Sequence, residues 1–204
     1  MSQEEKNFQI SSNVDNLELF CGDNAEYKLP LRRAGFDQEK DFTYFIKNVE
    51  RLVRNSTEYR EWKKYVKDVL GYCNCAFTSE KSSEVTIEIH HHPVTLFTLV
   101  KTVTVFSINK EKEFCSFDIA QQCIELHFSN RVGYIPLAST IHEKYHAGFL
   151  RIPIELVHGD WRYIVDNYPV DDLDIQLIGE QAAVKLEDIK VEWTKNNYPG
   201  VVNG

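Results

Sequence analysis

The sequence predicts an α+β protein in which helices and a small sheet share one core. Residues 84–89 alternate polar and apolar side chains, which is the pattern of a half-buried strand. Several other segments repeat apolar residues at the spacing of amphipathic helices. A second short strand is predicted at Val132 to Leu137, so two strands enclose a helical insertion, with a helical pair before them and an extension after them.

Composition limits the classes of protein to which this chain can belong. Its 204 residues suffice for one large domain or two small ones, and 43% hydrophobic residues are enough for a sizeable core. The net charge of -8 argues against a broad nucleic-acid surface, although it leaves room for a local basic cleft. The five cysteines are an odd number and no secretory segment is evident, so we expect a cytoplasmic setting. No apolar run approaches the ~20 residues of a membrane helix, so no membrane partner is expected.

The N-terminal part predicts an arm and a pair of helices. Residues 1–38 are mostly polar or irregular and are expected to form an arm that packs on the main body. Apolar positions at helical spacing predict helices from about Glu39 to Val53 and from about Glu58 to Leu70. The break at residues 55–57 separates them, and Gly71 ends the second. The second helix also carries four basic side chains: Arg60, Lys63, Lys64 and Lys67.

The middle and the end of the chain predict the insertion and the extension. Helices are expected from about Val94 to Phe106 and from Asp118 to Phe128, between the two strands. Residues 149–168 are apolar and predicted to be buried, in irregular or helical structure, and the acidic end contains strand-like pieces such as Ile175 to Ile178. The predicted division is an arm at 1–38, a main domain at 39–168 and an extension at 169–204.

Histidines gather in two segments of the chain. Five of the seven lie in Glu88 to Pro93, at the end of the first strand, and in His142 to His146. The second segment predicts a short helix that Ser139 or Thr140 can cap and that Gly148 can end. Two histidines four residues apart on a helix point the same way, so both can reach one ion. A strand end with adjacent histidines facing such a helix suits metal-assisted cleavage of a phosphodiester.

With these residues the sequence resembles the HNH (His-Me finger) endonucleases, particularly their small phage-type members, over roughly residues 70–160. The matching segments are Glu88-Ile89-His90-His91, Ile135-Pro136-Leu137, and His142 to His146 followed by Gly148. The resemblance implies a ββα-metal core, here with a helical insertion between its two strands. Near Gly133, the chain lacks the asparagine that this family usually carries on the second strand.

The resemblance also implies an activity and roles for individual residues. By position, His90, His142 and His146 hold the metal and His91 is the general base. The activity is that of a divalent-metal-dependent endonuclease that hydrolyses DNA, with one ion of Mg, Mn, Zn or Ni as the cofactor. Lys144 and Arg151 are expected to contact phosphates. If the gene is phage-encoded, the setting is the host cytoplasm.

One further requirement and two alternatives accompany this hypothesis. His90 and His91 can face one site only if Pro93 bends the chain, because an ideal strand sends neighbours to opposite faces. The run His142-Glu143-x-x-His146 also matches the zinc-peptidase signature, although Lys144 occupies a middle position that is usually uncharged. A non-catalytic interaction protein that keeps an HNH-like fold is the other alternative, with a protein partner on its acidic surface.

Overall fold

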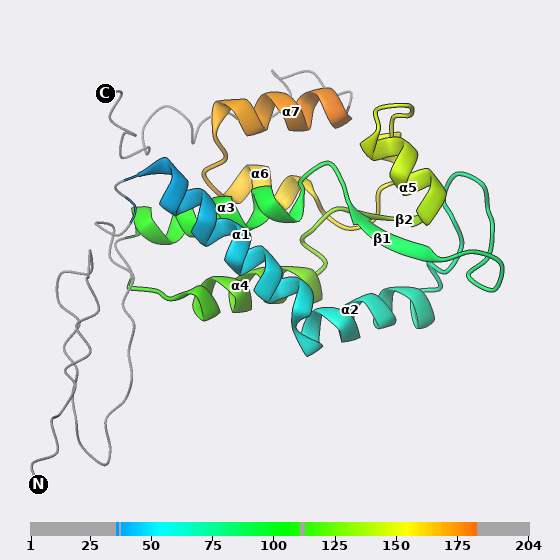
Figure 1. Cartoon of the computed structure of the whole chain (residues 1–204), viewed down its shortest axis with the longest axis horizontal. Helices are drawn as coiled ribbons and strands as arrows, with labels where there is room; N and C mark the ends of the chain where they lie inside the picture. The colour runs from blue at the N-terminus through cyan, green and yellow to red at the C-terminus, as the bar shows by residue number, and fades with distance from the viewer. Residues whose placement is uncertain (1–35, 37, 111–112, 183–204) are drawn as a thin grey trace, which may run out of the picture.

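The computed structural model describes residues 36, 38–110 and 113–182. Within them the chain forms helices α1 to α7, one short 3₁₀ turn and a two-stranded antiparallel sheet (Figure 1). This mixture of helix and sheet confirms the α+β prediction. Nearly all of the predicted arm at 1–38, and residues 183–204 of the predicted extension, lie outside the described residues.

The predicted N-terminal helical pair is present as α1 (Glu39–Asn55) and α2 (Thr57–Asp68). Ser56 separates them, and its side-chain oxygen accepts a hydrogen bond from the backbone N–H of Tyr59 at 3.1 Å. This contact satisfies one of the backbone donors that every helix leaves free in its first turn. The two helices bury residues three or four positions apart: Ile46, Val49 and Val53 in α1, and Tyr59, Trp62 and Val66 in α2.

The sheet consists of β1 (Ile87–His91) and β2 (Tyr134–Ala138). The strands are antiparallel, with Ile87 opposite Ala138 and His91 opposite Tyr134. Side chains in β1 alternate, so that Ile87, Ile89 and His91 are buried while the residues between them are half-buried. This alternation is the period of two on which the strand prediction rested.

The helical insertion between the strands is also present, as α3 (Leu96–Asn109) and α4 (Ser116–Phe128). Thr95 begins α3, because its side-chain oxygen accepts from the backbone N–H of Thr98 at 3.1 Å. Helix α1 packs against both α3 and α4, and all three contribute to the main hydrophobic core (Figure 1). The insertion is therefore part of the core and brings β2 back beside β1.

Helix α5 (Ser139–His146) follows β2 directly and lies against both strands. Its first turn is preceded by Ala138, which makes no side-chain cap, so the predicted cap by Ser139 or Thr140 is wrong. The predicted end is confirmed, because Gly148 adopts a φ of +77°, which favours glycine. A strand that leads straight into a helix places α5 next to the end of β1.

The C-terminal part of the described chain is helical. A 3₁₀ turn at Ile154–Leu156 leads to α6 (Arg162–Asn167) and α7 (Asp172–Ala182). The strand-like reading of Ile175 to Ile178 is therefore wrong. Both residues are buried one helical turn apart and belong to the main core. No helix in the described ranges is long and apolar enough to span a membrane.

Candidate metal centre

Three of the histidines singled out in the sequence come together in space. The Nε2 atom of His142 lies 2.8 Å from Nδ1 of His90 and 2.8 Å from Nε2 of His146. One ring nitrogen from each residue lies within 4.8 Å of the others, so the three form a set that could hold one metal ion. Imidazole nitrogens are ligands of Zn²⁺, Ni²⁺ and other divalent transition metals.

Two elements place these side chains. His90 belongs to the half-buried set of β1 and points toward α5, while His142 and His146 lie one turn apart on α5. The three differ in exposure: His90 is largely buried, His142 is intermediate and His146 is exposed. An ion held here would therefore be bound by the buried ring of His90 on one side and be accessible to solvent on the side of His146.

Glu88 also contacts the cluster, which the sequence analysis did not predict. Its carboxylate accepts a hydrogen bond from Nδ1 of His142. A neutral imidazole that donates from Nδ1 keeps its lone pair on Nε2, which is the atom facing the other two histidines. A carboxylate behind a ligating histidine is the usual outer contact in metal sites. The signal was in the sequence, because Glu88 stands two residues before His90 and shares its face of the strand.

Two histidines of this cluster, His90 and His146, have pKa values below the ordinary one. Burial, followed by the neighbouring His142 and His146, lowers the pKa of His90 to about 3. Burial also lowers the pKa of His146. Both rings are thus neutral at pH 7, as a metal ligand must be. In addition, Nε2 of His90 is buried and has no hydrogen-bond partner. The donor atoms, their protonation and the Glu88 contact fit a divalent ion.

His91 does not join the cluster, and the expected bend at Pro93 does not bring it there. It points to the opposite side of β1, where it is 6% exposed and stacks against the rings of Tyr59 and Trp62. Its Nε2 lies 2.8 Å from Nε2 of His127. Burial, followed by His127, lowers the pKa of His91 well below its ordinary value. The predicted general base therefore lies on the other side of β1 from the candidate metal site.

The partner of His91 fixes the protonation of this buried pair. Nδ1 of His127 donates a hydrogen bond to the carbonyl oxygen of Cys123 at 2.6 Å. Nε2 of a neutral His127 is then the acceptor, so Nε2 of His91 donates to it. Both histidines are satisfied inside the core and anchor α2 and α4 to β1.

The remaining predicted residues fall on either side of the cluster. His92 lies on the same side of the strand as His90, with their ring centroids 6.4 Å apart. Arg151 is exposed and lines a small pocket together with His92. Lys144 is exposed on α5 and does not line that pocket. The structure thus brings Arg151 to the neighbourhood of His92, whereas Lys144 stays in solvent.

Comparisons with known proteins identify one family. The model of the family described as Bacteriophage G278-like virion protein matches residues 2–201, which is nearly the whole chain. No curated protein and no solved structure matches the sequence.

Proposed function

The chain belongs to the family of G278-like bacteriophage virion proteins, and from this premise we propose that it is a virion component whose divalent-metal centre hydrolyses phosphodiester bonds. The observation that carries the proposal is the convergence of His90, His142 and His146. They come from a strand and from the helix that follows its partner strand, which is the order that a ββα-metal core requires. DNA is the proposed substrate.

Each residue of the centre has a distinct task in this proposal. His90, His142 and His146 hold the ion, and Glu88 fixes the ring of His142 with Nε2 turned inward. The bound ion would offset negative charge on the phosphate and on the leaving oxygen. Arg151 contributes a second positive charge from the pocket beside the centre. His91 has no part in the reaction, because its ring is buried on the other side of β1.

Metal binding to the full chain tests the first half of the proposal. Calorimetry with Zn, Mn, Mg and Ni should find one site, and His142→Ala should abolish it. Glu88→Gln should weaken it by about 10- to 100-fold, as loss of an outer contact usually does. Glu143→Ala is the matched control on the same helix and should leave the affinity unchanged. Failure of all four metals to bind would reject the centre.

Cleavage of plasmid DNA tests the second half. The metal-loaded chain should nick or cut the plasmid, chelator should stop the reaction, and His146→Ala should lose it while Glu143→Ala keeps it. Cleavage of casein that depends on Glu143 would instead support the zinc-peptidase hypothesis.

A structural metal centre is the second candidate function, and the burial of His91 favours it. A nuclease needs a base near the attacking water, and the predicted base lies outside the cluster. In this alternative the ion only ties α5 to β1 in a non-catalytic virion protein. Metal would then bind and raise the unfolding temperature, and no cleavage would accompany it.

A further inference from the structure

The turn that follows α5 has a well-fixed backbone. The N–H of Gly148 donates to the carbonyl of Tyr145 at 2.9 Å, which ends the helix. The N–H of Phe149 donates to the carbonyl of Lys144, also at 2.9 Å. These two hydrogen bonds are those of a Schellman motif. Leu150, the next residue, packs against a buried cluster to which β2 contributes, so the backbone of Phe149 is held on both sides.

The side chain of Phe149 nevertheless stands in solvent. In a Schellman motif the residue at this place often packs against an apolar side chain one turn back on the helix. Here those positions are Glu143 and Lys144, and the phenyl ring is 83% exposed. Single exposed apolar side chains are common on protein surfaces. Phe149 differs in its fixed backbone and in its place, three residues after the candidate metal ligand His146.

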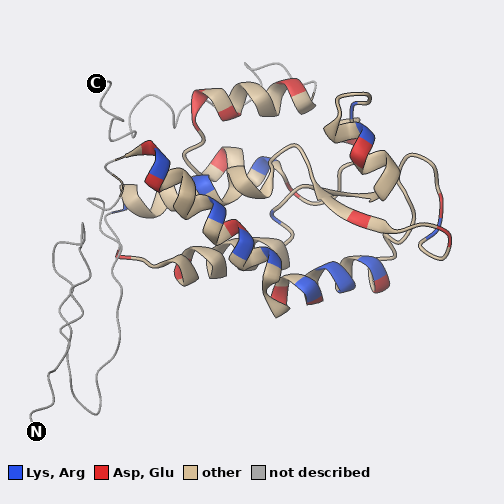
Figure 2. Ribbon diagram, in the orientation of Figure 1, with Lys and Arg blue, Asp and Glu red and all other residues tan. Residues whose placement is uncertain are grey.

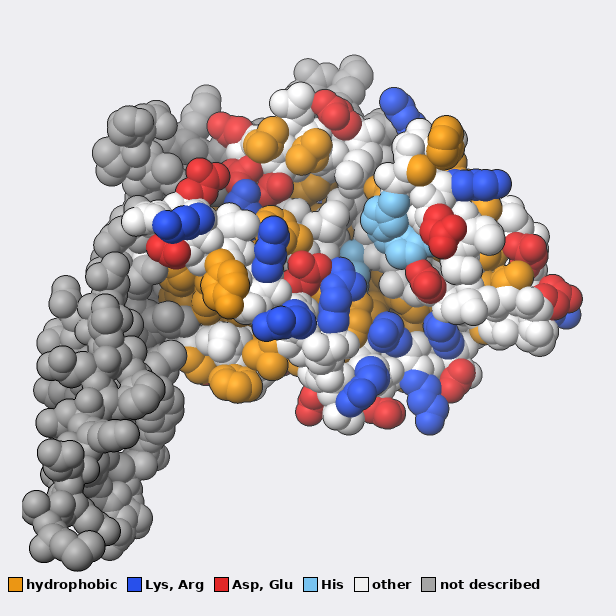
Figure 3. Space-filling view, viewed as in Figure 1, with side chains coloured by type: hydrophobic (Ala, Val, Ile, Leu, Met, Phe, Trp, Pro, Cys, Tyr) orange, Lys and Arg blue, Asp and Glu red, His pale blue; other side chains and the backbone are white. Residues whose placement is uncertain are grey.

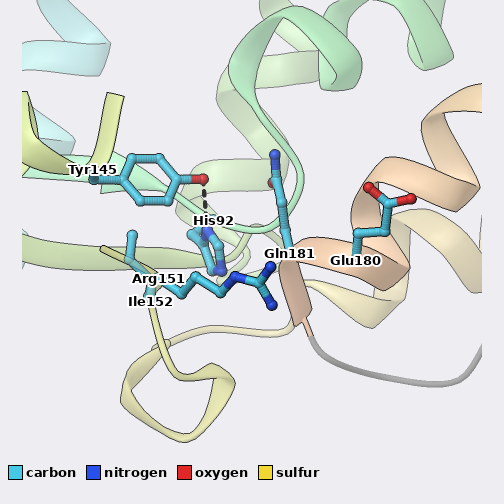
Figure 4. A pocket seen from close by; sticks show the side chains of 6 residues that line it. All are labelled: His92, Tyr145, Arg151, Ile152, Glu180 and Gln181. Atoms are coloured by element: carbon cyan, nitrogen blue, oxygen red, sulfur yellow. Dashed lines mark hydrogen bonds between the residues drawn. The ribbon is translucent and has the colours of Figure 1, made fainter. Parts of the chain in front are cut away.

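The charges near the ring are mostly positive. Among residues 142–152, with histidine taken as neutral, the charged side chains are Glu143, Lys144 and Arg151, whereas the whole chain carries -8. All three are exposed, and Arg151 also lines the small pocket beside His92 (Figure 4). Figure 3 shows hydrophobic and basic side chains together over the end of α5, next to the exposed histidines. This end of the molecule therefore suits an anionic partner that offers a flat apolar surface.

We propose that Phe149 stacks on an unpaired nucleobase, while Lys144 and Arg151 contact phosphates of the same strand. Aromatic rings beside cations hold single-stranded nucleic acids in many proteins, because every base has a π-face. In a duplex the neighbouring bases cover these faces, so the substrate class is single-stranded or locally opened nucleic acid. A plasmid also offers such bases, where negative supercoiling opens the duplex. That the stacked base lies beside the cleaved phosphate rests on the proposed function, whereas the stacking itself does not.

A membrane or a protein surface fits the ring less well. A single myristoyl chain gives only marginal membrane binding, and one phenyl ring has less apolar surface than that. Protein interfaces are marked by contiguous apolar patches. Within residues 142–152, however, Phe149 is the one large apolar side chain that is exposed. A single stacked base needs no larger surface.

The test is fluorescence anisotropy of a labelled single-stranded oligonucleotide that is titrated with the full chain in chelator, so that no cleavage occurs. The natural chain should bind the intact strand more tightly than an abasic strand of the same length and charge. Phe149→Ala should weaken binding to the intact strand by about 5- to 150-fold, the usual effect of losing one stacked base. This variant should then bind both strands alike, and Phe149→Trp should keep the preference.

Three controls separate stacking from charge and from folding. Phe117→Ala is the matched variant, since Phe117 is 68% exposed on α4 and its loss should leave the affinity unchanged. A fully paired duplex of the same sequence should bind equally well to the natural chain and to Phe149→Ala. Lys144→Gln should weaken the intact and the abasic strand alike. It should also lower the slope of log affinity against log salt by about 0.7, because it removes one phosphate contact to a single strand.

Several results would overturn the proposal. They are equal binding of the intact and abasic strands by the natural chain, and an unchanged preference in Phe149→Ala. Binding to phosphatidylserine vesicles, or self-association in ultracentrifugation, would also overturn it if either is lost in Phe149→Ala. Preference for the intact strand in a chain that binds no metal would instead reject the proposed function and leave the stacking standing. Conversely, metal-dependent cleavage of dilute single strands at the same rate in Phe149→Ala would keep the function and reject the stacking.

Discussion

Gly133 lies where the backbone leading into β2 passes closest to the segment that carries His92. Its carbonyl accepts a hydrogen bond from the backbone N–H of His92 at 3.1 Å. A Cβ at this position would lie 2.2 Å from the carbonyl oxygen of His92 and 2.6 Å from Cβ of Trp161. The backbone oxygen cannot move aside without disturbing the sheet. No side chain fits here, which is a physical reason why this position is a glycine.

We therefore expect Gly133→Ala to lower the free energy of unfolding by about 1–3 kcal/mol, the usual cost of overpacking. Gly71→Ala provides the comparison, since a Cβ there meets nothing within 4 Å and only the φ of +77° is unfavourable. That strain costs roughly 1–2 kcal/mol. Urea unfolding measures both, and the metal affinity of Gly133→Ala should also fall because β2 leads into α5. An unchanged stability would show that the two segments separate easily.

His127 makes stability depend on pH. Burial lowers its pKa to about 4, whereas an unfolded histidine titrates near ~6.5. Above pH 6.5 both states are neutral and stability is at its full value. As pH falls from 6.5 toward 4 the unfolded chain takes up the proton first, so up to about 3 kcal/mol is lost.

His127→Gln should remove this part of the acid loss while its amide keeps the contact with the Cys123 carbonyl. Unfolding free energies at pH 7 and pH 4.5 should therefore differ by about 2–3 kcal/mol less in the variant than in the natural chain. Equal differences in the two proteins would mean that the ring is hydrated and titrates normally.

At this scale the sequence correctly predicted that His90, His142 and His146 come together, whereas it wrongly placed His91 beside them. The proximity of His142 and His146 could be predicted from their spacing alone, because residues four positions apart lie on the same face of any α-helix. His91 could not be placed with them, since the period of a strand puts it opposite His90. The expected bend at Pro93 was an added assumption. The buried partner His127 comes from the insertion, which no local pattern connects to β1.

Helix α7 is held on α3 by a compact charge cluster. The ammonium group of Lys101 bridges the carboxylates of Asp171 and Asp174, and its side chain is 23% exposed. The two carboxylates raise the pKa of Lys101 against the opposing effect of burial. The three charges are partly shielded from water, so losing the lysine removes the cation that bridges the two carboxylates.

Lys101→Met should therefore loosen α7 more than the rest of the chain. We expect a loss of about 1–2 kcal/mol, which is less than for a fully buried pair because solvent screens this one. Hydrogen exchange should accelerate in α7 and stay unchanged in α1 and α4. Uniform acceleration in all helices would show that α7 unfolds only with the whole core.

The elements themselves were predictable to different degrees. Helices α1 to α4 followed from long periodic apolar patterns, and the structure shifts their ends by a few residues. In α7 the short window at Ile175 to Ile178 looked like a strand, because two β-branched residues dominate it. Its helical character depends on packing against the core through Ile175, Ile178 and Ala182, which are separated by helical turns.

The whole molecule is acidic, yet its charges are unevenly distributed. Basic side chains gather on α2 (Figure 2), and Figure 3 shows them on the same face as the exposed histidines. Arg60 and Lys64 are exposed on this helix. Near the sheet, Lys67 donates to the carbonyl of Ile87 in β1, which joins the basic helix to the strand of the metal centre. A DNA strand at the centre would therefore meet α2.

Arg60→Gln and Lys64→Gln should each lower the slope of log affinity against log salt by about one unit, because each removes one phosphate contact. The weakening should be alike on all DNA sequences, since such contacts carry no base information. Lys110→Gln, an exposed lysine after α3, is the control and should leave the slope unchanged. If the two α2 variants behave like Lys110→Gln, a protein partner on the acidic surface becomes the better hypothesis.

The insertion also separates two of the candidate metal ligands by a long stretch of chain. His90 and His142 are 52 positions apart, and helices α3 and α4 occupy the interval. An ion bound to both would close this stretch into a ring and deprive the unfolded chain of much of its freedom. For a loop of this size the entropic gain is about 4 kcal/mol, comparable to that of a disulfide. The protein would then possess a reversible cross-link that forms or opens with the concentration of the free metal ion.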